Sequence, residues 1–451
     1  MKTYLVHWRQ RHPSFRLPEL EALAKLGNLK LQYDVPPNHE EVPYLCIQCE
    51  CDDDARKLAK RSILIRDVLE LWDHGETLEE VHRKLRPKAF LYEHHAKDTF
   101  KFRIHSFGKS LPLELQPEVV DQFAYLGWQG KIDLTHPQVQ VMLLLHMDDH
   151  ATSDALLAGT KHVYVGRLIQ EGNASVVSEF HNKNRQYLGV TTMDAELSLI
   201  CANIALARPG TVICDPFVGT GSFLFTCSKF GAYTFGCDID GRQLRGKDGK
   251  SVESNIQQYR LQGTVLGNYI CDMAHHPWRN VRFLDAIVCD PPYGIRAGAK
   301  KVGCDTIKSS PKCVLTKDGS VRYPSTLPYE IDDVLKDLLD FATQHLAEGG
   351  RLVYWLPVAN ESLDHMNGLP MEEILQRAIP QHPLLRLASV SRQAFGKWQR
   401  LLICQELVLD ERRNGTVSEG YINGSNCISH NDFRRLYFSK APNTVKVIPG
   451  Q

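Results

Sequence analysis

The sequence predicts an α/β chain in which an α+β first half precedes a second half built around a parallel sheet. Two observations support this prediction. Strands and helices of mixed order fill the first half, whereas strands, loops and helices alternate regularly from residue 182 onward. The 451 residues, 43% of them hydrophobic, suffice for two or three domains with their own cores. We expect three domains, at residues 1–75, 76–172 and 173–409, followed by a loose polar tail at 410–451.

The first segment, residues 1–75, is predicted to be a small α+β unit. Its strand-like stretches are 3–8, 43–51 and 62–72, and its helical stretches are 16–27 and 52–61. The first helix ends at a glycine, and three successive aspartates charge the N-terminus of the second. We interpret the order as β-α-β-β-α-β, which is typical of a ferredoxin-like unit.

The second segment, residues 76–172, is predicted to be another small α+β unit. A charged helical linker at residues 79–88 leads into it. Its strands are expected at 99–107, 131–147 and 162–169, and its helix at 117–128. These strands combine β-branched, aromatic and apolar residues, as half-buried strands do.

The third segment, residues 173–409, shows the alternation of a parallel sheet. Strands are expected at 211–215, 233–240, 267–272, 286–289 and 351–358, and helices at 222–230 and 331–350, the latter with a glycine stop. The apolar pair 383–395 and 399–408 predicts an antiparallel hairpin at the sheet edge. Polar side chains at several strand ends would then share one edge of the sheet.

Composition narrows the class of protein. The formal net charge of +0 neither favours nor excludes a nucleic-acid partner. We find no membrane-spanning apolar stretch and no signal peptide, so we expect a cytoplasmic protein without a membrane partner. The 13 cysteines are scattered, as thiols in a reducing compartment are. Cys46, Cys49 and Cys51 include a C-x-x-C spacing, but no second pair follows; we favour a core strand over a metal or redox site and expect no metal.

The stretch VICDPFVGTGSF, residues 212–223, predicts a glycine-rich turn between a strand and a helix. Gly219 and Gly221 let the backbone approach a ligand at the free N–H groups of the helix. The spacing matches neither common phosphate-binding motif, and Asp215 adds a negative charge. A cationic or zwitterionic ligand such as S-adenosylmethionine suits the turn better. Asp215, Phe217, Gly219 and Gly221 are therefore candidate cofactor-binding residues, with an ordinary tight turn as the alternative.

Acidic residues also end the next two strands. Asp238 is the first candidate for hydrogen bonds to a ribose diol and Asp240 the second, although Asp240 could instead cap a helix. Asp272 ends the third strand and could accept a hydrogen bond from an adenine amine. Three successive strand ends thus offer carboxylates at the edge where such sheets bind ligands.

A fourth strand of the same sheet ends in the residues CDPPYG. Two prolines fix the backbone and cannot donate hydrogen bonds, so the carbonyls near Asp290 and Pro291 and the Asp290 carboxylate become oriented acceptors. Tyr293 offers a ring for stacking. This set suits a flat heterocycle with an –NH2 group, held in line with a methyl donor. Asp290, Pro291, Pro292 and Tyr293 are the candidate catalytic residues, and Asp290 could also accept the proton shed after transfer.

These motifs together resemble a known family. The D-P-P-Y tetrapeptide and the DPFVGTGS…DID series resemble class I amino methyltransferases. Residues 185–222 and the stretch GGRLVYWLPV are similar to the catalytic subunit of eukaryotic tRNA (guanine-10-N2)-methyltransferases. The first half is similar to that family's ferredoxin-like and THUMP domains, through the stretches FRLPE, ELWDHG and GKIDLTHPQ. The resemblance extends from Thr3 to Leu409.

The resemblance implies a Rossmann-like methyltransferase domain after a ferredoxin-like and THUMP RNA-binding region. It implies S-adenosylmethionine as cofactor, with Tyr187, Gly189 and Thr192 lining its methionine end. It implies methyl transfer to N2 of guanine ten in tRNA by a catalytic subunit that works with a small zinc-binding activator, as a heterodimer. The sequence departs from the family at VTTMD, where Thr-Ser is more usual before Met-Asp, and in the polar loop at 297–328.

Two basic runs in the first half could contact RNA phosphates. They comprise Arg56, Lys57, Lys60 and Arg61, and then Arg83, Lys84, Arg86 and Lys88. Clustered cations of this kind bind phosphates by releasing counterions. A solvated helix face is the alternative for either run.

Two other functions stay open on the residues alone. The D-P-P-Y motif does not distinguish a guanine amine from an adenine amine, so an adenine-N6 methyltransferase acting on nucleic acid is one alternative. A non-catalytic RNA-binding scaffold is the other. The intact acidic and glycine residues of the site argue against the scaffold, and the RNA-binding character of the first half favours tRNA.

Overall fold

The computed structural model describes residues 1–148, 159–292, 299–303, 314–315, 321–323, 326–359, 379–396 and 398–409. The chain divides into two compact units, Met1–Ser175 and Val176–Gln451, each with its own large sheet. The expected tail from residue 410, and most of the expected polar loop, lie outside the described residues.

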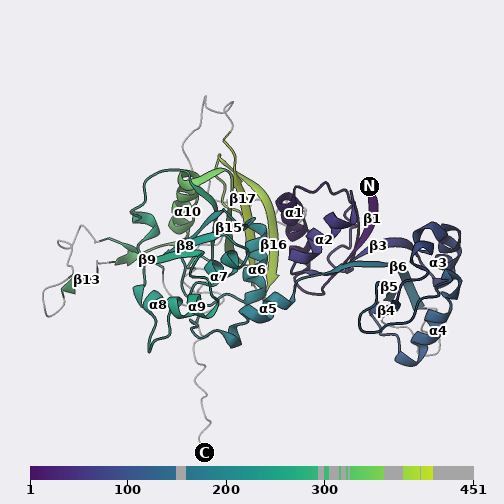
Figure 1. The fold of residues 1–451 in the computed structure, drawn as a ribbon. Coiled ribbons are helices and arrows are strands. Elements are labelled where there is room, and N and C mark those ends of the chain that lie inside the picture. Colours follow the sequence, from purple (N-terminus) through teal and green to yellow (C-terminus); the bar gives the residue numbers. More distant parts are fainter. Residues whose placement is uncertain are drawn as a thin grey trace, which may run out of the picture. The chain divides into compact units, whose positions relative to one another are not determined.

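Six strands of the first unit form one sheet, in the order β2-β1-β3-β6-β5-β4. These strands are β1 (Lys2–Trp8), β2 (Tyr44–Cys49), β3 (Ile65–Gly75), β4 (Phe100–Phe107), β5 (Val139–Met147) and β6 (Thr160–Glu171). Its helices are α1 (Arg16–Gly27), α2 (Asp52–Arg61), α3 (Leu78–Leu85) and α4 (Gln116–Asp121). Figure 1 shows α1 and α2 near β1, and α3 and α4 at the other end of the sheet.

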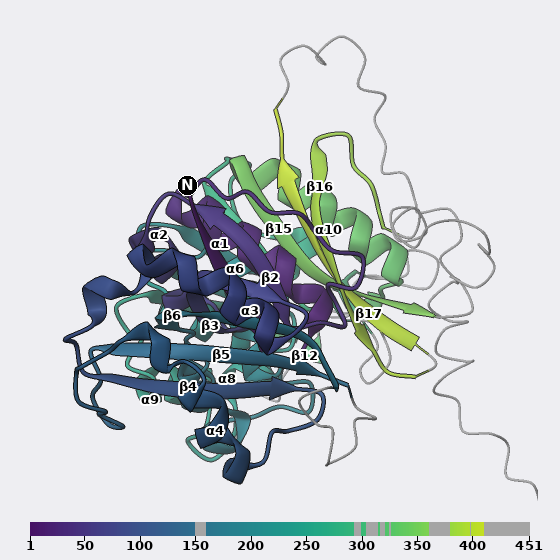
Figure 2. The ribbon, with the colours of Figure 1, turned by 90° about the vertical axis from the view of Figure 1, so that its right-hand side faces the viewer.

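The two α+β segments expected in the first half share this sheet. Strand β3 pairs antiparallel with β1 on one side and with β6 on the other. Figure 2 shows how the ladder continues through β6, β5 and β4, which lie side by side. The expected boundary at residue 75 therefore falls at the end of a strand that both segments use.

The order of elements in residues 1–75 differs from the expected β-α-β-β-α-β. All of these residues are described, and one strand, β2, lies between α1 and α2. Residues 28–43 include Pro36, Pro37 and Pro43, which cannot donate to a strand ladder. An isolated bridge between Gln32 and Gln48 forms there instead of a second strand.

Helix α3 is part of the core of the first unit, which corrects its expected role as a charged linker. Thr77 caps it by accepting a hydrogen bond from the Glu80 N–H at 3.1 Å. Leu78, Val81 and Leu85 are buried in a cluster with strands β3, β5 and β6. The apolar residues recur every three or four positions, so one face of this charged helix packs inward.

A seven-stranded sheet forms the centre of the second unit, in the order β16-β17-β15-β10-β7-β8-β9. Its strands are β7 (Val212–Asp215), β8 (Tyr233–Asp238), β9 (Val265–Ile270), β10 (Leu284–Cys289), β15 (Leu346–Ala359), β16 (Leu385–Ala394) and β17 (Trp398–Leu407). Short strands are β11 (Lys300–Val302), β12 (Val314–Leu315), β13 (Val321–Tyr323) and β14 (Thr326–Pro328). The helices are α5 (Ser175–Phe180), α6 (Ala195–Ile204), α7 (Ser222–Lys229), α8 (Gly241–Arg245), α9 (Val252–Gln258) and α10 (Ile331–His345).

The strand order reverses between β7 and β10. From β7 the chain moves outward to β8 and β9 and then returns to β10 on the other side of β7, with all of these pairings parallel. β15 pairs parallel with β10, and the expected hairpin β16–β17 adds antiparallel strands beyond it. Ligands bind parallel sheets where the order reverses, outside the carboxyl ends of the strands. The expected Rossmann-like arrangement is thereby confirmed.

Helix α10 ends earlier than the glycine stop predicts. The helix ends at His345, and β15 begins at the next residue, so Gly349 and Gly350 lie within the strand. The pairing of β10 with β15 shifts in register between Leu284 and Ala286. A Cβ on Gly350 would lie 2.8 Å from the Ala347 carbonyl oxygen, and Gly349 has a positive φ of 73°. These two glycines therefore form a bulge in the strand instead of ending the helix.

Candidate active site at the carboxyl edge of the second sheet

Two aspartates flank the point where the strand order reverses. Asp215 is the last residue of β7, and Asp290 follows the last residue of β10. The two strands are direct neighbours, with Ile287 opposite Cys214. The expected cofactor residue and the expected catalytic residue are therefore brought together.

The glycine-rich turn after β7 has the backbone that only glycine adopts easily. Gly219 and Gly221 have φ angles of 50° and 88°, and Gly221 is the N-cap of α7. A Cβ on Gly221 would lie 2.6 Å from the Phe225 ring. The Val218 N–H donates to the Cys237 carbonyl at 2.9 Å, which fixes the turn against β8. The turn thus lies directly over the ends of β7 and β8, as the sequence predicts.

Asp215 is a buried acid in this turn. It is 2% exposed, and its Oδ1 accepts a hydrogen bond from the Phe217 N–H at 3.0 Å. Burial raises the pKa of Asp215 well above its usual range against this hydrogen bond, and the negative charges of Asp238 and Asp290 raise it further. A cationic group placed nearby would be attracted to this carboxylate.

Asp238 is placed to bind a diol, whereas Asp240 is already engaged. Asp238 accepts hydrogen bonds from the N–H groups of Gly219, at 2.9 Å, and Asp240, at 2.8 Å, one at each carboxylate oxygen. Each oxygen keeps a further lone pair for a ligand. Burial raises the pKa of Asp238 against these two hydrogen bonds. Asp240 caps α8 and pairs with both ends of the Arg242 guanidinium at 2.8 Å, as the capping alternative predicted.

Asp272 makes most of its hydrogen bonds within the protein. Its carboxylate accepts from the Ala274 N–H at 3.0 Å and the Val302 N–H at 2.7 Å, and it contacts His275 Nδ1 at 2.9 Å. The carboxylate therefore joins the end of β9 to the short strand β11. Asp272 lies at the expected edge, but an adenine amine would share it with these three partners.

The segment before α6 contacts the glycine-rich turn. The Thr192 hydroxyl lies 2.9 Å from the Thr220 hydroxyl and accepts a hydrogen bond from the Gly189 N–H at 2.8 Å. A Cβ on Gly189 would lie 2.8 Å from a methyl carbon of Thr220. The Tyr187 hydroxyl donates to the Gln243 carbonyl of α8 at 2.8 Å. Of the three residues that the resemblance singles out, Gly189 and Thr192 therefore lie against the turn, and Tyr187 contacts α8.

The catalytic motif is described as far as Pro292. Pro291 is buried and Pro292 half-buried, and Tyr293 lies outside the described residues. Asp290 Oδ2 lies 3.9 Å from Arg400 Nη1 of β17. Sequence reasoning missed Arg400, although an arginine directly before the mainly apolar stretch LLICQEL was a signal.

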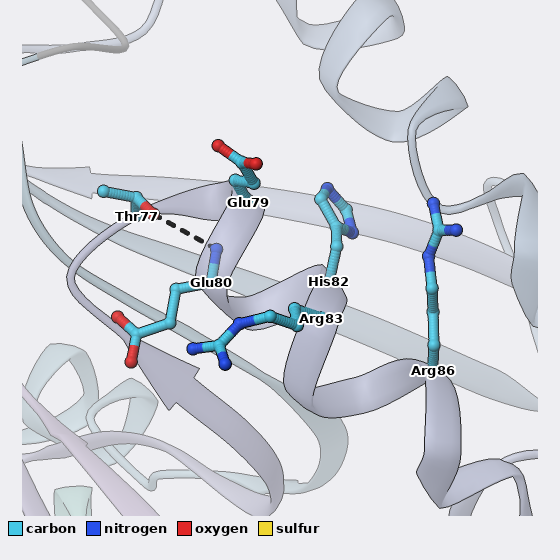
Figure 3. Close-up of a pocket in the computed structure, with 6 residues that line it drawn as sticks. All are labelled: Thr77, Glu79, Glu80, His82, Arg83 and Arg86. Carbon is cyan, nitrogen blue, oxygen red and sulfur yellow. Dashed lines mark hydrogen bonds between the residues drawn. The ribbon is translucent and has the colours of Figure 1, made fainter.

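The basic runs of the first unit are partly neutralised, by acidic residues of their own helices and by Asp73 of β3. Ion pairs join Arg56 to Asp53, Lys57 to Asp54, Lys84 to Glu80 and Lys88 to Asp73 at 2.6–3.1 Å. Lys60 is exposed and Arg61 is half-buried. Arg83 on α3 and Arg86 directly after it are exposed and line a hollow together with Thr77, Glu79, Glu80 and His82 (Figure 3). Arg86 also lies over the Tyr125 ring, 4.9 Å from its centroid.

The cysteine cluster forms part of strand β2. Cys46 is exposed and Cys49 is buried, because residues three apart on a strand point to opposite faces. Their thiols therefore cannot share a metal ion on this strand. Across the described ranges, no three His, Cys, Asp or Glu residues are grouped to hold a metal, and no helix is long and apolar enough to cross a membrane.

Comparisons with known proteins agree with this division of the chain. Residues 2–174 match the family model described as "Tmrp11 THUMP N-terminal domain", and residues 182–307 match "RMKL-like, methyltransferase domain". The chain is 35% identical to the tRNA (guanine(10)-N(2))-methyltransferase of Schizosaccharomyces pombe, covering 98% of this chain and 97% of that protein. It is 36% identical to that of Saccharomyces cerevisiae, covering 97% and 99%. Among solved structures, TrmN from Thermus thermophilus is 16% identical, covering 90% of this chain and 100% of that one, with a TM-score of 0.43.

Proposed function

The chain belongs to the tRNA (guanine(10)-N(2))-methyltransferase family, and on this premise we propose that it methylates the exocyclic N2 of guanine ten in tRNA. It is an S-adenosylmethionine-dependent methyltransferase, and its second unit carries the candidate active site. One observation carries the proposal. Asp215 and Asp290 follow adjacent strands and flank the glycine-rich turn where the strand order reverses.

The residues at this edge fit S-adenosylmethionine. When bound, it supplies a methyl group made electrophilic by a positively charged sulfur. The buried carboxylate of Asp215 would favour that cation, because burial raises the pKa of this acid and the negative charges of Asp238 and Asp290 raise it further. Asp238 would hold the ribose diol, and the backbone at Gly219 and Gly221, which carries no side chains, would let the ligand approach the turn.

At the end of β10, the proposed catalytic residues mainly position the guanine amine. Asp290 would accept a hydrogen bond from the guanine amine and point the nitrogen lone pair towards the methyl carbon. Pro291 and Pro292 have no N–H groups, so nothing on them competes for the same acceptors. As the nitrogen–carbon bond forms and the carbon–sulfur bond breaks, the nitrogen gains positive charge, and Asp290 is placed to receive its surplus proton. Tyr293 stays predicted to stack on the base.

The test combines product identification with one variant. Unmodified tRNA and labelled S-adenosylmethionine are incubated with the wild-type chain, with Asp290→Ala and with the matched control Asp333→Ala, whose carboxylate is exposed on α10. Mass spectrometry of the nucleosides should find N2-methylguanosine with the wild type and the control but not with Asp290→Ala. Methyladenosine would favour the adenine alternative. Cofactor binding without product, even with the activator present, would favour the scaffold.

We also propose that a small zinc-binding activator covers the edge strand β9. β9 is the last strand of the sheet, so one of its sides has no strand partner in the part of the chain that the structure describes. Leu266, Tyr269 and Ile270 on this strand are each about half exposed, which is unusual for three large apolar residues so close together. A partner that adds a strand there would satisfy the backbone and bury the apolar side chains.

The first unit is the proposed tRNA-binding part. We propose residues 1–75 as its ferredoxin-like portion, 76–172 as its THUMP portion and 173–409 as the methyltransferase domain. Among the basic residues, Arg83 and Arg86 best support phosphate contact, because they are exposed and form no ion pair among the described residues. Arg56 and Lys57 support it less, because the aspartates of α2 already pair with them.

A further inference from the structure

The hairpin β16–β17 brings a guanidinium group to the candidate catalytic carboxylate. Arg400 Nη1 lies 3.9 Å from Asp290 Oδ2, although the residues are far apart in the sequence. The side chains are only 16% and 24% exposed. Water therefore screens this pair less than it screens a surface ion pair. The positive charge can act on the carboxylate at the place where the amine would bind.

Arg400 is held in place by four other side chains. Its guanidinium carbon lies 4.2 Å from the Trp355 ring centroid and 5.6 Å from that of Phe395. Its Nε donates to Gln393 Oε1 at 2.6 Å, and its Nη2 approaches Met193 Sδ at 3.5 Å. A planar guanidinium stacked on a ring and bonded at its edge has little rotational freedom. The direction in which the charge faces Asp290 is thereby fixed.

We propose that Arg400 is a positioning residue for methyl transfer, acting through Asp290. The inference rests on the proposed function of the same site. By attracting Oδ2, the guanidinium fixes the rotation of the carboxylate that would face the amine. Its positive charge also favours the ionised form of the carboxylate, which can accept hydrogen bonds at both oxygens and can take up a proton. Cofactor binding depends on the ends of β7 and β8 and is independent of Arg400.

The acid and thiol groups near Asp290 bring no positive charge to it. Asp215 of β7 adds a negative charge near it. Cys201 of α6 and the adjacent Cys289 are buried thiols whose pKa values burial raises well above their usual range, so they stay neutral. Arg400 brings positive charge to this carboxylate.

The test compares Arg400→Gln and Arg400→Lys with a matched control. The control is Arg386→Gln on the same hairpin, where the side chain is 69% exposed and pairs with Glu406 at 3.5 Å. We expect Arg400→Gln to lower kcat by about 100-fold, the scale of a misplaced catalytic group, with an unchanged Kd for S-adenosylmethionine. Without the positive charge, protonation of Asp290 becomes easier, so the acid limb of the kcat profile should move to higher pH. Arg400→Lys should restore the acid limb but only part of kcat, because an ammonium group does not stack like a guanidinium.

Wild-type kcat and an unchanged pH profile in Arg400→Gln would overturn the inference. So would a loss of activity that Arg400→Lys does not reduce and that comes without a pH shift, since that pattern indicates a structural role alone. If Arg400→Gln does not fold, the same comparison uses Arg400→Lys and Gln393→Ala, which frees the Nε of the guanidinium; wild-type kinetics in both would overturn it. The methylated nucleoside that the wild-type chain produces is identified in parallel by mass spectrometry. An adenine product would refute the proposed substrate and leave the role of Arg400 testable on that amine.

Discussion

Replacement of Gly221 by alanine should destabilise the second unit by two separable effects. Gly221 has a φ of 88°, and alanine in that region costs about 1–2 kcal/mol. The new Cβ would also lie 2.6 Å from the Phe225 ring, which must move, and overpacking of this kind costs about 1–3 kcal/mol. We therefore expect a total loss of about 2–5 kcal/mol. Because the proposed cofactor site includes this turn, affinity for S-adenosylmethionine should fall as well.

Gly210 provides a matched control for the steric part of that estimate. Its φ of 86° is nearly that of Gly221, but a Cβ there would have no heavy atom within 4 Å. Gly210→Ala should therefore lose only the backbone part, about 1–2 kcal/mol, and should bind S-adenosylmethionine normally. Urea unfolding followed by circular dichroism, with calorimetric titration of the cofactor, measures both effects. Equal losses of stability in the two variants would refute the steric argument, and undiminished cofactor affinity in Gly221→Ala would refute the role of the turn.

Three further predictions concern separate parts of the chain. Thr192→Val removes the hydroxyl that joins its loop to the glycine-rich turn. Calorimetry should show that affinity for the cofactor falls roughly tenfold, which is the contribution of about one hydrogen bond. Thr192→Ser keeps a hydroxyl and should restore the affinity. Burial opposes ionisation of Asp52, but hydrogen bonds from Tyr4 and Arg167 lower its pKa from 3.8 to about 2. Its contribution to stability is therefore complete above pH 4 and is lost as the pH falls towards 2; urea midpoints measured across this range should fall less in Asp52→Asn. Leu266→Lys on β9 should abolish co-purification with the activator without changing the melting temperature, and retained binding would count against that surface.

The sequence predicted those residues of the candidate site that lie at the end of a single strand. Asp215, Asp238 and Asp290 each follow an apolar stretch short enough to be a buried strand. Parallel strands have their carboxyl ends at one edge, so local patterns sufficed to bring these three together. The glycines of the turn could be predicted for the same reason, because their positive φ angles are a local property of the backbone.

Contacts between distant segments could not be predicted. Asp272 has the expected place on its strand, but the N–H of Val302 occupies one of its oxygens. Arg400 reaches Asp290 only because β17 pairs with β15 and β15 with β10. Helix α3 looked like a linker because its charges are conspicuous and its apolar residues, Val81 among them, are few. In each case the deciding partner comes from another strand, and no local pattern identifies it.

The charges at the edge of the second sheet are divided between two tasks. Asp215 is buried without a cationic partner among the described residues, so a positively charged ligand gains the most there. Asp290 follows the adjacent strand β10 and lies two residues further along the strand direction than Asp215. It has Arg400 beside it and so gains less from a cation. A neutral amine that offers hydrogen-bond donors is therefore the better ligand for Asp290. In the proposed function, this difference would separate the methyl donor from the methyl acceptor by charge. Both carboxylates would repel a pyrophosphate, so such a ligand does not suit this glycine-rich turn.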